Sequence, residues 1–384
     1  MRLAVSCRNF VPWILILGFA LLCSGCGGGG EIRKTISTSV NSSGNAAQQN
    51  QTAETTQRVT YIFEYDSDSG KNDELRSMLI DGTNDKLLDS APILSRMDIT
   101  DESNQAYYIR ADDVWPIMAY EVYSVNTGGG AAANQTNDEF ANYQVQCMDN
   151  GTVYTSSNAD IGGGVYQGDV YRLGSSGATQ ITNTGTFGVW FKVSPNEDYI
   201  VYLDSVSSAK NIYYYNVAQA TETLLASQAT DIYHDIAISS DGNYILYFSN
   251  CSSTLSMSCR DMHVIDTEGN VVFEQINAFA MNGVWAPDST RFVVTQVELD
   301  GSDAVVALNI YAMPSGGKTR IMAKAHESYI ITDWSSDGTL LLGMKSLLEG
   351  ENSNLFVMNP DGSNVITLTV TPNGQYAGLG KFSR

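Results

Sequence analysis

Basic residues and histidines are scarce in this chain of 384 residues. It has 21 Lys and Arg against 42 Asp and Glu, which gives a formal net charge of −21, and only 3 His. Neutralising phosphates needs a basic face, so this balance argues against nucleic acid and against electrostatic binding to anionic lipid. Charged residues make up 16% of the chain and hydrophobic residues 43%. That composition excludes wholesale disorder and provides enough apolar side chains for a core.

Catalytic motifs are absent as well. The chain has neither a Gly-x-Ser-x-Gly elbow nor a Gly-rich phosphate loop, which argues against a serine hydrolase of that type and a nucleotide-binding loop. The acidic segment that starts at Asp66 is similar to an EF-hand loop, but Lys71 stands where Gly is required and Ser77 where Glu is required. The sequence therefore predicts no catalytic residue and no cofactor.

The first residues have the pattern of a secretion signal. Two arginines precede a mostly apolar run over residues 10–22, which is too short to span a bilayer permanently. Residues 22–26 resemble the lipobox of bacterial lipoprotein signal peptides, although Cys23 stands where Leu is usual. The resemblance implies a signal peptide over residues 1–25, acylation of Cys26 and, because Gly27 follows, an outer-membrane protein facing the periplasm or the cell surface. An ordinary cleaved signal with an incidental Cys26 is the alternative.

Residues 26–57 consist mainly of Gly, Ser, Thr, Asn and Gln with almost no large apolar side chains. Such a segment cannot bury enough surface to offset its ordering entropy, so we expect a flexible tether. Residues 58–384 then form an acidic body that associates with the membrane only through the lipid anchor.

A repeat of roughly 47 residues fills the chain after the tether. Its four clearest copies start with an anchor sequence at Val193, Ile238, Trp285 and Trp334, and weaker copies start at Ile99 and Gln146. The spacings between these six positions are 47, 47, 45, 47 and 49 residues. Each anchor predicts a tight turn, and hairpin turns separate the strands that follow it.

The predicted strands are short, apolar and rich in Tyr. They cover residues 58–63, 74–80, 86–88, 199–202, 211–215, 244–247, 271–273, 291–294, 340–342, 354–358 and 365–369. Four short strands per unit are typical of a propeller blade. The strand at 58–63 has no anchor before it, and Gly380–Arg384 is similar to the start of another anchor. The sequence thus predicts an all-β propeller closed by pairing of its N- and C-terminal strands, with seven four-stranded blades, or six or eight.

These copies resemble the TolB-type (WD40-like) β-propeller repeat, which reads roughly Trp-Ser-Pro-Asp-Gly, a strand, then Met-Asn-x-Asp-Gly-Ser and Leu-Thr. Residues 334–338, 358–363 and 368–369 match that pattern closely. The resemblance covers residues 58–384 and implies the propeller fold. It does not imply one function, because such blades occur in scaffolds, in gating domains of peptidases and in lyases.

Few residues are candidates for special chemistry. Cys251 and Cys259 flank a seven-residue loop between two predicted strands, and we expect a structural disulfide between them outside the cytoplasm. Propeller lyases that resemble this fold hold a metal with several His, whereas the three His here are scattered. We therefore predict no metal site; His234 and His326, which lie shortly before two anchors, are the only candidates for one.

These observations favour a monomeric, non-enzymatic scaffold at the cell envelope. Its partner would be an envelope or extracellular protein or peptide, or a glycan, bound on one face or at the mouth of the central channel. The alternative is a polysaccharide-binding protein or a propeller lyase or hydrolase that uses the channel.

Overall fold

The computed structural model divides the chain into residues 1–56 and a second unit, Gln57–Arg384. The described residues are 57–66, 69–100, 103–112, 120–136, 141–160, 166–175, 177–183, 190–204, 210–228, 230–232, 235–251, 259–300, 303–347 and 352–383. The predicted signal peptide, Cys26 and the tether up to residue 56 lie outside them. Within the described ranges, no helix has the length and hydropathy needed to cross a bilayer.

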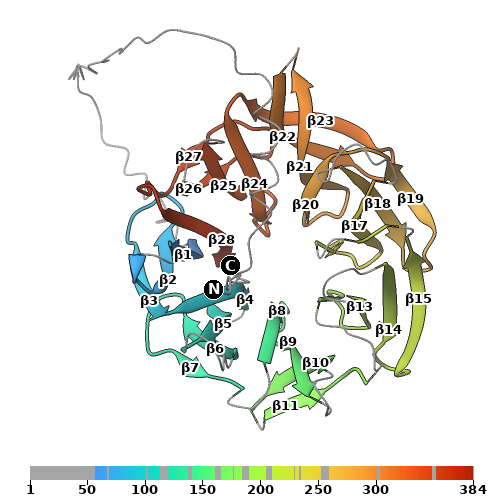
Figure 1. Cartoon of the computed structure of the whole chain (residues 1–384), viewed down its shortest axis with the longest axis horizontal. Helices are drawn as coiled ribbons and strands as arrows, with labels where there is room; N and C mark the ends of the chain where they lie inside the picture. The colour runs from blue at the N-terminus through green and yellow to red at the C-terminus, as the bar shows by residue number, and fades with distance from the viewer. Residues whose placement is uncertain are drawn as a thin grey trace, which may run out of the picture. The chain divides into compact units, whose positions relative to one another are not determined.

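The strands of the second unit form antiparallel sheets, and five of these are separate and four-stranded. Each is listed from its inner to its outer strand as drawn in Figure 1. The first sheet has β4 (Ile93–Thr100), β5 (Gln105–Ala111), β6 (Glu121–Asn126) and β7 (Ala133–Asn134), and the second has β8 (Ala141–Cys147), β9 (Val153–Asp160), β10 (Tyr166–Gly174) and β11 (Gly177–Gln180). The third has β12 (Phe191–Val193), β13 (Tyr199–Leu203), β14 (Asn211–Asn216) and β15 (Thr221–Ser227), and the fourth has β16 (Ala237–Ile238), β17 (Tyr244–Asn250), β18 (Arg260–Asp266) and β19 (Val271–Gln275). The fifth has β20 (Ala280–Trp285), β21 (Arg291–Asp300), β22 (Asp303–Ala312) and β23 (Gly317–Lys324). The predicted all-β fold with four-stranded blades is therefore correct.

The remaining eight strands form one sheet. They are β24 (Glu327–Trp334), β25 (Leu341–Leu347), β26 (Asn352–Met358) and β27 (Ile366–Thr367), followed by β28 (Gln375–Ser383), β1 (Arg58–Tyr65), β2 (Asp73–Leu79) and β3 (Lys86–Ala91). Strand pairing thus gives five separate blades rather than the predicted seven. The physical reason is a short parallel pairing of β26 with β28, Asn352 with Gln375 and Ser353 with Tyr376, which merges two groups of four strands.

Strand β28 also pairs with β1, at the other end of the described chain. The register runs antiparallel from Arg58 opposite Ser383 to Tyr65 opposite Gln375, with an irregularity between Thr60 and Ile62. The Ser383 hydroxyl donates a hydrogen bond of 3.0 Å to the Arg58 carbonyl. As a result β1 has a hydrogen-bonded neighbour on both of its edges.

The anchor sequences form the tight turns that the repeat predicts. At Ser335 the backbone N–H bonds to the Leu340 carbonyl at 2.9 Å, and the Gly338 N–H bonds back to the Ser335 carbonyl at 2.8 Å. The same two bonds recur at Ser194, Ser239 and Ala286. In a weaker copy the Met148 N–H bonds to the Thr152 carbonyl, one residue closer, and the Gly151 N–H bonds to the Met148 carbonyl. The Ser335 hydroxyl also accepts the Leu340 N–H at 2.8 Å, so Ser at this position holds the turn closed.

The core lies between neighbouring sheets. On β17, Ile245 and Tyr247 pack with Tyr199 and Val201 of the preceding sheet, whereas Leu246 and Phe248 face the following sheet. Because both faces of β17 are buried, its sequence is almost continuously apolar rather than alternating.

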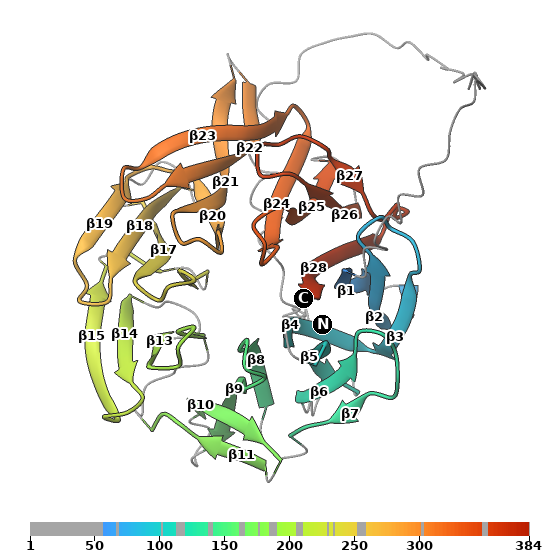
Figure 2. The ribbon, with the colours of Figure 1, turned by 180° about the vertical axis from the view of Figure 1, so that it is seen from behind.

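Seven strands lie innermost and are called the inner strands: β4, β8, β12, β16, β20, β24 and β28. Each contacts the next in this order, and β28 also contacts β4. Figures 1 and 2 show five of them, β4, β8, β20, β24 and β28, from opposite sides, gathered around the middle of the sheets. Side chains far apart in the sequence are therefore brought together there.

Candidate functional site at the inner strands

Polar side chains gather on the inner strands at one repeated position, two residues before the residue that opens each anchor turn. This set, called the inner row, is Asp98, Gln146, Lys192, Ala237, Val284, Asp333 and Lys381. Five of its seven members are polar or charged although the strands around them are apolar. A buried polar group is costly unless it is bonded, so the bonds of these side chains identify their roles.

Two glutamines fasten β8 to β12. The Gln144 side chain donates to the Phe191 carbonyl at 2.7 Å and accepts the Phe191 N–H at 3.3 Å. Gln146 makes the same pair of bonds with Val193, at 3.0 and 2.9 Å. Each amide thus satisfies both backbone groups of one residue in the next sheet. We call a side chain that accepts a backbone N–H of the following inner strand a clasp.

Two carboxylates are clasps as well. Asp98 accepts the Cys147 N–H at 2.9 Å through Oδ2 and the Ile99 N–H at 3.0 Å through Oδ1. Asp333 accepts the Phe382 N–H at 2.8 Å through Oδ2. Since Cys147 and Phe382 belong to the following inner strand, these bonds hold neighbouring sheets in register.

The two lysines of the inner row cannot accept a hydrogen bond and so cannot be clasps. The Lys381 ammonium lies 3.7 Å from Asp333 Oδ1. Burial lowers the pKa of Lys192, and the positive charges of Lys381 and Arg96 lower it further, against the opposing effects of Asp98 and Asp235. The charges of Lys381 on β28 and Arg96 on β4 therefore both act on Lys192 of β12.

Arg96 reaches across one sheet. It lies in an irregularity of β4 between Ser95 and Met97 and has a positive φ of 48°, which is unfavourable for a residue with a Cβ. Its guanidinium carbon stands 4.4 Å from the ring centroid of Trp190, which directly precedes β12. Burial lowers the pKa of Arg96, opposed by the charges of Asp235 and Glu64. The stacking fixes the guanidinium plane.

Only one of the two histidine candidates for a metal site can be located in the structure. His234 lies outside them. His326 is exposed in the connection between β23 and β24. No group of three or more His, Cys, Asp or Glu side chains suited to a metal occurs in the ranges that the structure describes.

His263 is the buried histidine of the described chain. Its Nε2 lies 2.9 Å from the Ser249 hydroxyl and its Nδ1 lies 2.9 Å from Glu274, while its ring stacks on Tyr247 at 4.7 Å. Burial lowers its pKa, and Glu274 and Asp261 oppose that shift. Ser249 is 1% exposed and His263 3% exposed. The Ser249 hydroxyl and the His263 ring are therefore packed inside the protein, and Ser249 cannot reach a substrate as a nucleophile.

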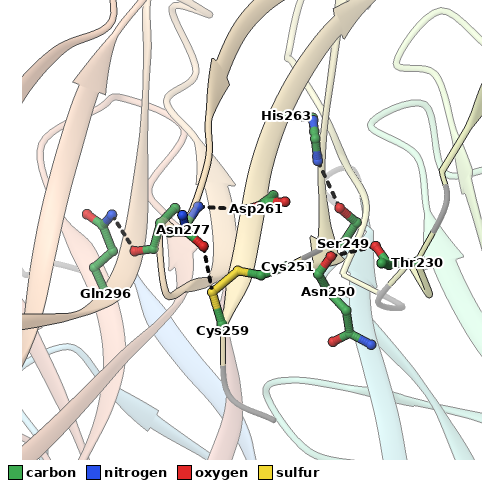
Figure 3. Close-up of a disulfide and its surroundings, with 10 residues drawn as sticks. Thr230, Ser249, Asn250, Cys251, Cys259, Asp261, His263, Asn277 and Gln296 are labelled. Carbon is green, nitrogen blue, oxygen red and sulfur yellow. Dashed lines mark hydrogen bonds between the residues drawn. A yellow bond between two sulfur atoms is a disulfide. The ribbon is translucent and has the colours of Figure 1, made fainter. Parts of the chain in front are cut away.

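Cys251 and Cys259 form a disulfide with Cα atoms 5.4 Å apart, shown with its surroundings in Figure 3. The Cys251 N–H also bonds to the Cys259 carbonyl at 3.2 Å. Asn277 Oδ1 lies 3.3 Å from Cys259 Sγ, and the Asn277 N–H donates to Asp261 at 2.6 Å. These contacts tie the ends of β17 and β18 to the segment that leads into β20.

The inner row and Arg96 were not among the residues expected from the sequence. A usable signal exists: a charged residue stands immediately before the anchor residue in four copies, as Asp98, Lys192, Asp333 and Lys381. A charged residue that recurs at the same place in four repeats indicates that these side chains occupy equivalent positions on the inner strands.

Comparison with known proteins concerns the fold. No protein-family model matches the chain, and no curated protein matches it. Similar solved structures include a candidate 6-phosphogluconolactonase from Bacteroides fragilis (TM-score 0.52, 12% identity, 88% of this chain and 100% of that one). Hydrazine synthase of Kuenenia stuttgartiensis (0.51, 12%, 73% and 80%) and TolB from Acinetobacter baumannii (0.49, 13%, 85% and 67%) are similar as well. At such identities the likeness shows the propeller fold alone.

Proposed function

We propose that this chain is a propeller-type interaction module that binds a protein or peptide at its inner strands. The observation that carries the proposal is the inner row: polar side chains from several sheets meet there, and clasps hold the strands beneath them in place. A binding surface on rigid elements loses little freedom when a partner docks, so more of the interaction energy appears as affinity.

Site-specific photo-crosslinking on the full chain in native envelopes tests this function. A photoreactive residue at Asn282, next to the inner row on β20, should give one discrete adduct that untagged residues 57–384 compete away. The matched control is Thr223 on the outer strand β15, which is exposed. Equal labelling from both positions, or an adduct that resists competition, would count against binding at the inner strands.

We further propose that Cys26 is acylated and that the propeller is held at the envelope, in the outer membrane. The support is the lipobox resemblance of residues 22–26. Labelling with a clickable palmitate analogue should mark the wild type and the Cys23→Ser variant and should not mark Cys26→Ser. Labelling of Cys26→Ser would show that the anchor lies elsewhere or that the signal is an ordinary one.

The eight-stranded sheet also supports a seven-blade arrangement, with β24–β27 and β28–β1–β2–β3 as two blades. Their hydrogen-bonded junction is only two residue pairs long. A Cβ added at Gly378 would lie 2.7 Å from Met344 Sδ, and one at Gly380 would lie 3.0 Å from Leu342 Cδ2. Strand β28 therefore packs against β25 through side chains, as neighbouring blades do. Seven blades in an electron-density map of residues 57–384 would support this count, and six or eight would reject it.

A further inference from the structure

Two cations near the middle of the sheets have donors without acceptors. Among the described residues, neither the Lys192 ammonium nor the Arg96 guanidinium has a hydrogen bond or an ion pair. The Arg96 guanidinium makes a cation–π contact with the Trp190 ring. Lys192 and Arg96 are both only partly exposed. An ammonium has three donors and a guanidinium five, and none of these atoms is among the buried groups without a partner, so they remain open to solvent or a ligand.

The acceptors nearby each have a partner already. Both oxygens of Asp98 bind backbone N–H groups, and Asp333 binds the Phe382 N–H and faces Lys381. The clasp Gln146 uses its carbonyl on Val193. Asp235 and Glu64 act on these cations only from beyond the 4.0 Å of an ion pair. Solvent or a bound ligand therefore supplies the acceptors of Lys192 and Arg96.

The geometry of Arg96 is suited to such an acceptor. Its backbone has a φ of 48°, and the equivalent residues of β20 and β28, Asn282 and Leu379, have φ values of 54° and 50°. This bulge is therefore a repeated feature of the inner strands, and it sets where the Arg96 side chain starts. With one face stacked on Trp190, the guanidinium leaves its edge for a planar group with two oxygens, which it can bind in a bidentate manner.

We propose that Lys192 and Arg96 together bind a carboxylate group presented by a peptide, either a C-terminus or an acidic side chain. The inference rests on the proposed function, because it names the group by which the inner strands recognise a partner. A singly charged carboxylate fits better than a phosphate dianion, since Asp98, Asp235 and Asp333 lie close by and the chain carries a net charge of −21. Additional negative charge would be repelled.

Protection of Lys192 from chemical labelling tests the proposal on purified residues 57–384. The protein is trace-acetylated with acetic anhydride at constant ionic strength, and each lysine is quantified by mass spectrometry. The probes are N-acetyl-triglycine, its C-terminal amide and inorganic phosphate. We expect the free acid to slow acetylation of Lys192 at least fivefold and the amide to leave it unchanged. The exposed Lys210 reports any general effect and should not respond.

Three results would overturn the proposal: equal protection by acid and amide, protection by phosphate but not by the acid, or no protection by any probe. Variants give a second measurement, by titration calorimetry with the free acid. Lys192→Gln and Arg96→Gln should weaken binding at least tenfold, whereas Lys192→Arg and the control Lys210→Gln should keep it within about twofold. If Lys192→Gln does not fold, the other two variants still test the proposal. Folded Arg96→Gln should lose binding of the free acid, and Lys192→Arg should keep it.

The two proposals fail separately. If the acid does not bind but the crosslink from Asn282 persists, the inner strands bind a partner through another group and the carboxylate inference is wrong. If the acid binds at Lys192 while no competed crosslink forms, the anion site stands and the partner binds elsewhere.

Discussion

At the scale of single residues, the glycines of the hairpin and anchor turns differ in what surrounds them. Gly362 and Gly338 both follow Asp in a turn and have similar φ values of 84° and 74°. A Cβ at Gly362 would lie 2.1 Å from the Ile321 carbonyl oxygen, whereas one at Gly338 would meet only Pro287 Cγ at 3.6 Å. The two positions therefore share backbone strain and differ in close contact with a neighbouring sheet.

We expect Gly362→Ala to lower the free energy of unfolding by about 3 kcal/mol and Gly338→Ala by about 1 kcal/mol, because only the first adds a clash with backbone to the cost of a positive φ. Chemical denaturation of both variants and the wild type measures the difference. Equal losses would mean that the loop around Gly362 moves away without cost.

The buried His263 predicts a pH dependence of stability. Burial holds its pKa below the ordinary value of 6.5, so as the pH falls through 6.5 the unfolded chain gains a proton that the folded chain does not. The contribution of this residue to the free energy of unfolding is thus present above pH 6.5 and is lost as the pH falls toward the folded pKa. His263→Gln, which does not titrate, should lose less stability than the wild type between pH 7.5 and 5.

Urea unfolding of the two proteins at each pH gives this comparison, since the other groups are common to both. Glu274 and Asp261 are the carboxylates that act on His263, and Glu274→Gln should enlarge the pH dependence because it removes a charge that favours the imidazolium. Parallel curves for the wild type and His263→Gln would show that His263 titrates alike in both states.

At the scale of the strands, the clasps explain how short inner strands keep their register. Strand β12 has three residues, Phe191–Val193, yet Gln144 and Gln146 bond both backbone groups of its first and last residue. Removing such a side chain leaves buried N–H and C=O groups without partners, which costs more than the bond itself contributed.

Gln144→Leu should therefore lower the free energy of unfolding by about 2–4 kcal/mol, since two buried backbone groups lose their partner. The control Gln135→Leu changes an exposed amide and should stay within about 0.5 kcal/mol of the wild type. Thermal and urea unfolding measure both variants. A small effect of Gln144→Leu would mean that water replaces the amide between β8 and β12.

The disulfide fastens the ends of β17 and β18. Its partners are eight residues apart, so the loop-entropy model assigns it about 2.5 kcal/mol. We expect reduction, or the paired change Cys251→Ser and Cys259→Ser, to lower the free energy of unfolding by up to that amount. In an alkylation assay on denatured, non-reduced protein, Cys147 should be modified and Cys251 and Cys259 should not. Modification of all three would show that the bond does not form in solution.

The turns and strands could be predicted because their signals are local. The anchor at Ser335 lies within six residues of the carbonyl that it bonds, and the apolar run at 244–247 falls within β17. The pairing of β26 with β28 and the clasps could not be predicted, because they join residues whose proximity depends on the curvature of the whole unit. Gln144 and Phe191 are 47 residues apart, and nothing in either segment alone indicates the other. The proximity of Lys192 and Arg96 could not be predicted for the same reason.

At the scale of the whole unit, the sheet shared by the two ends of the described chain is expected to control cooperativity. Strand β28 pairs with β1 and packs on β25, and its removal would leave an unpaired edge on β1 and uncovered apolar groups on β25. Exposed edges of this kind promote association between chains.

Deleting residues 375–384 should abolish a single cooperative unfolding transition and shift the protein to oligomers in size-exclusion chromatography with light scattering. Deleting residues 1–56 is the control and should leave both properties unchanged, because all described strands lie in the second unit. A monomeric, cooperative 375–384 deletion would mean that β28 is not needed to hold the unit together.

The pairing of Arg58 with Ser383, 325 residues away, also has a consequence for biosynthesis. Translation proceeds at roughly 5–20 residues per second, so β1 waits on the order of 15–65 s before β28 has been made. During that interval β1, β2 and β3 form an incomplete sheet whose open edge is available to other nascent chains. Strand β28 is the last of the described strands to be synthesised. We therefore expect association between chains to be favoured until β28 has paired with β1.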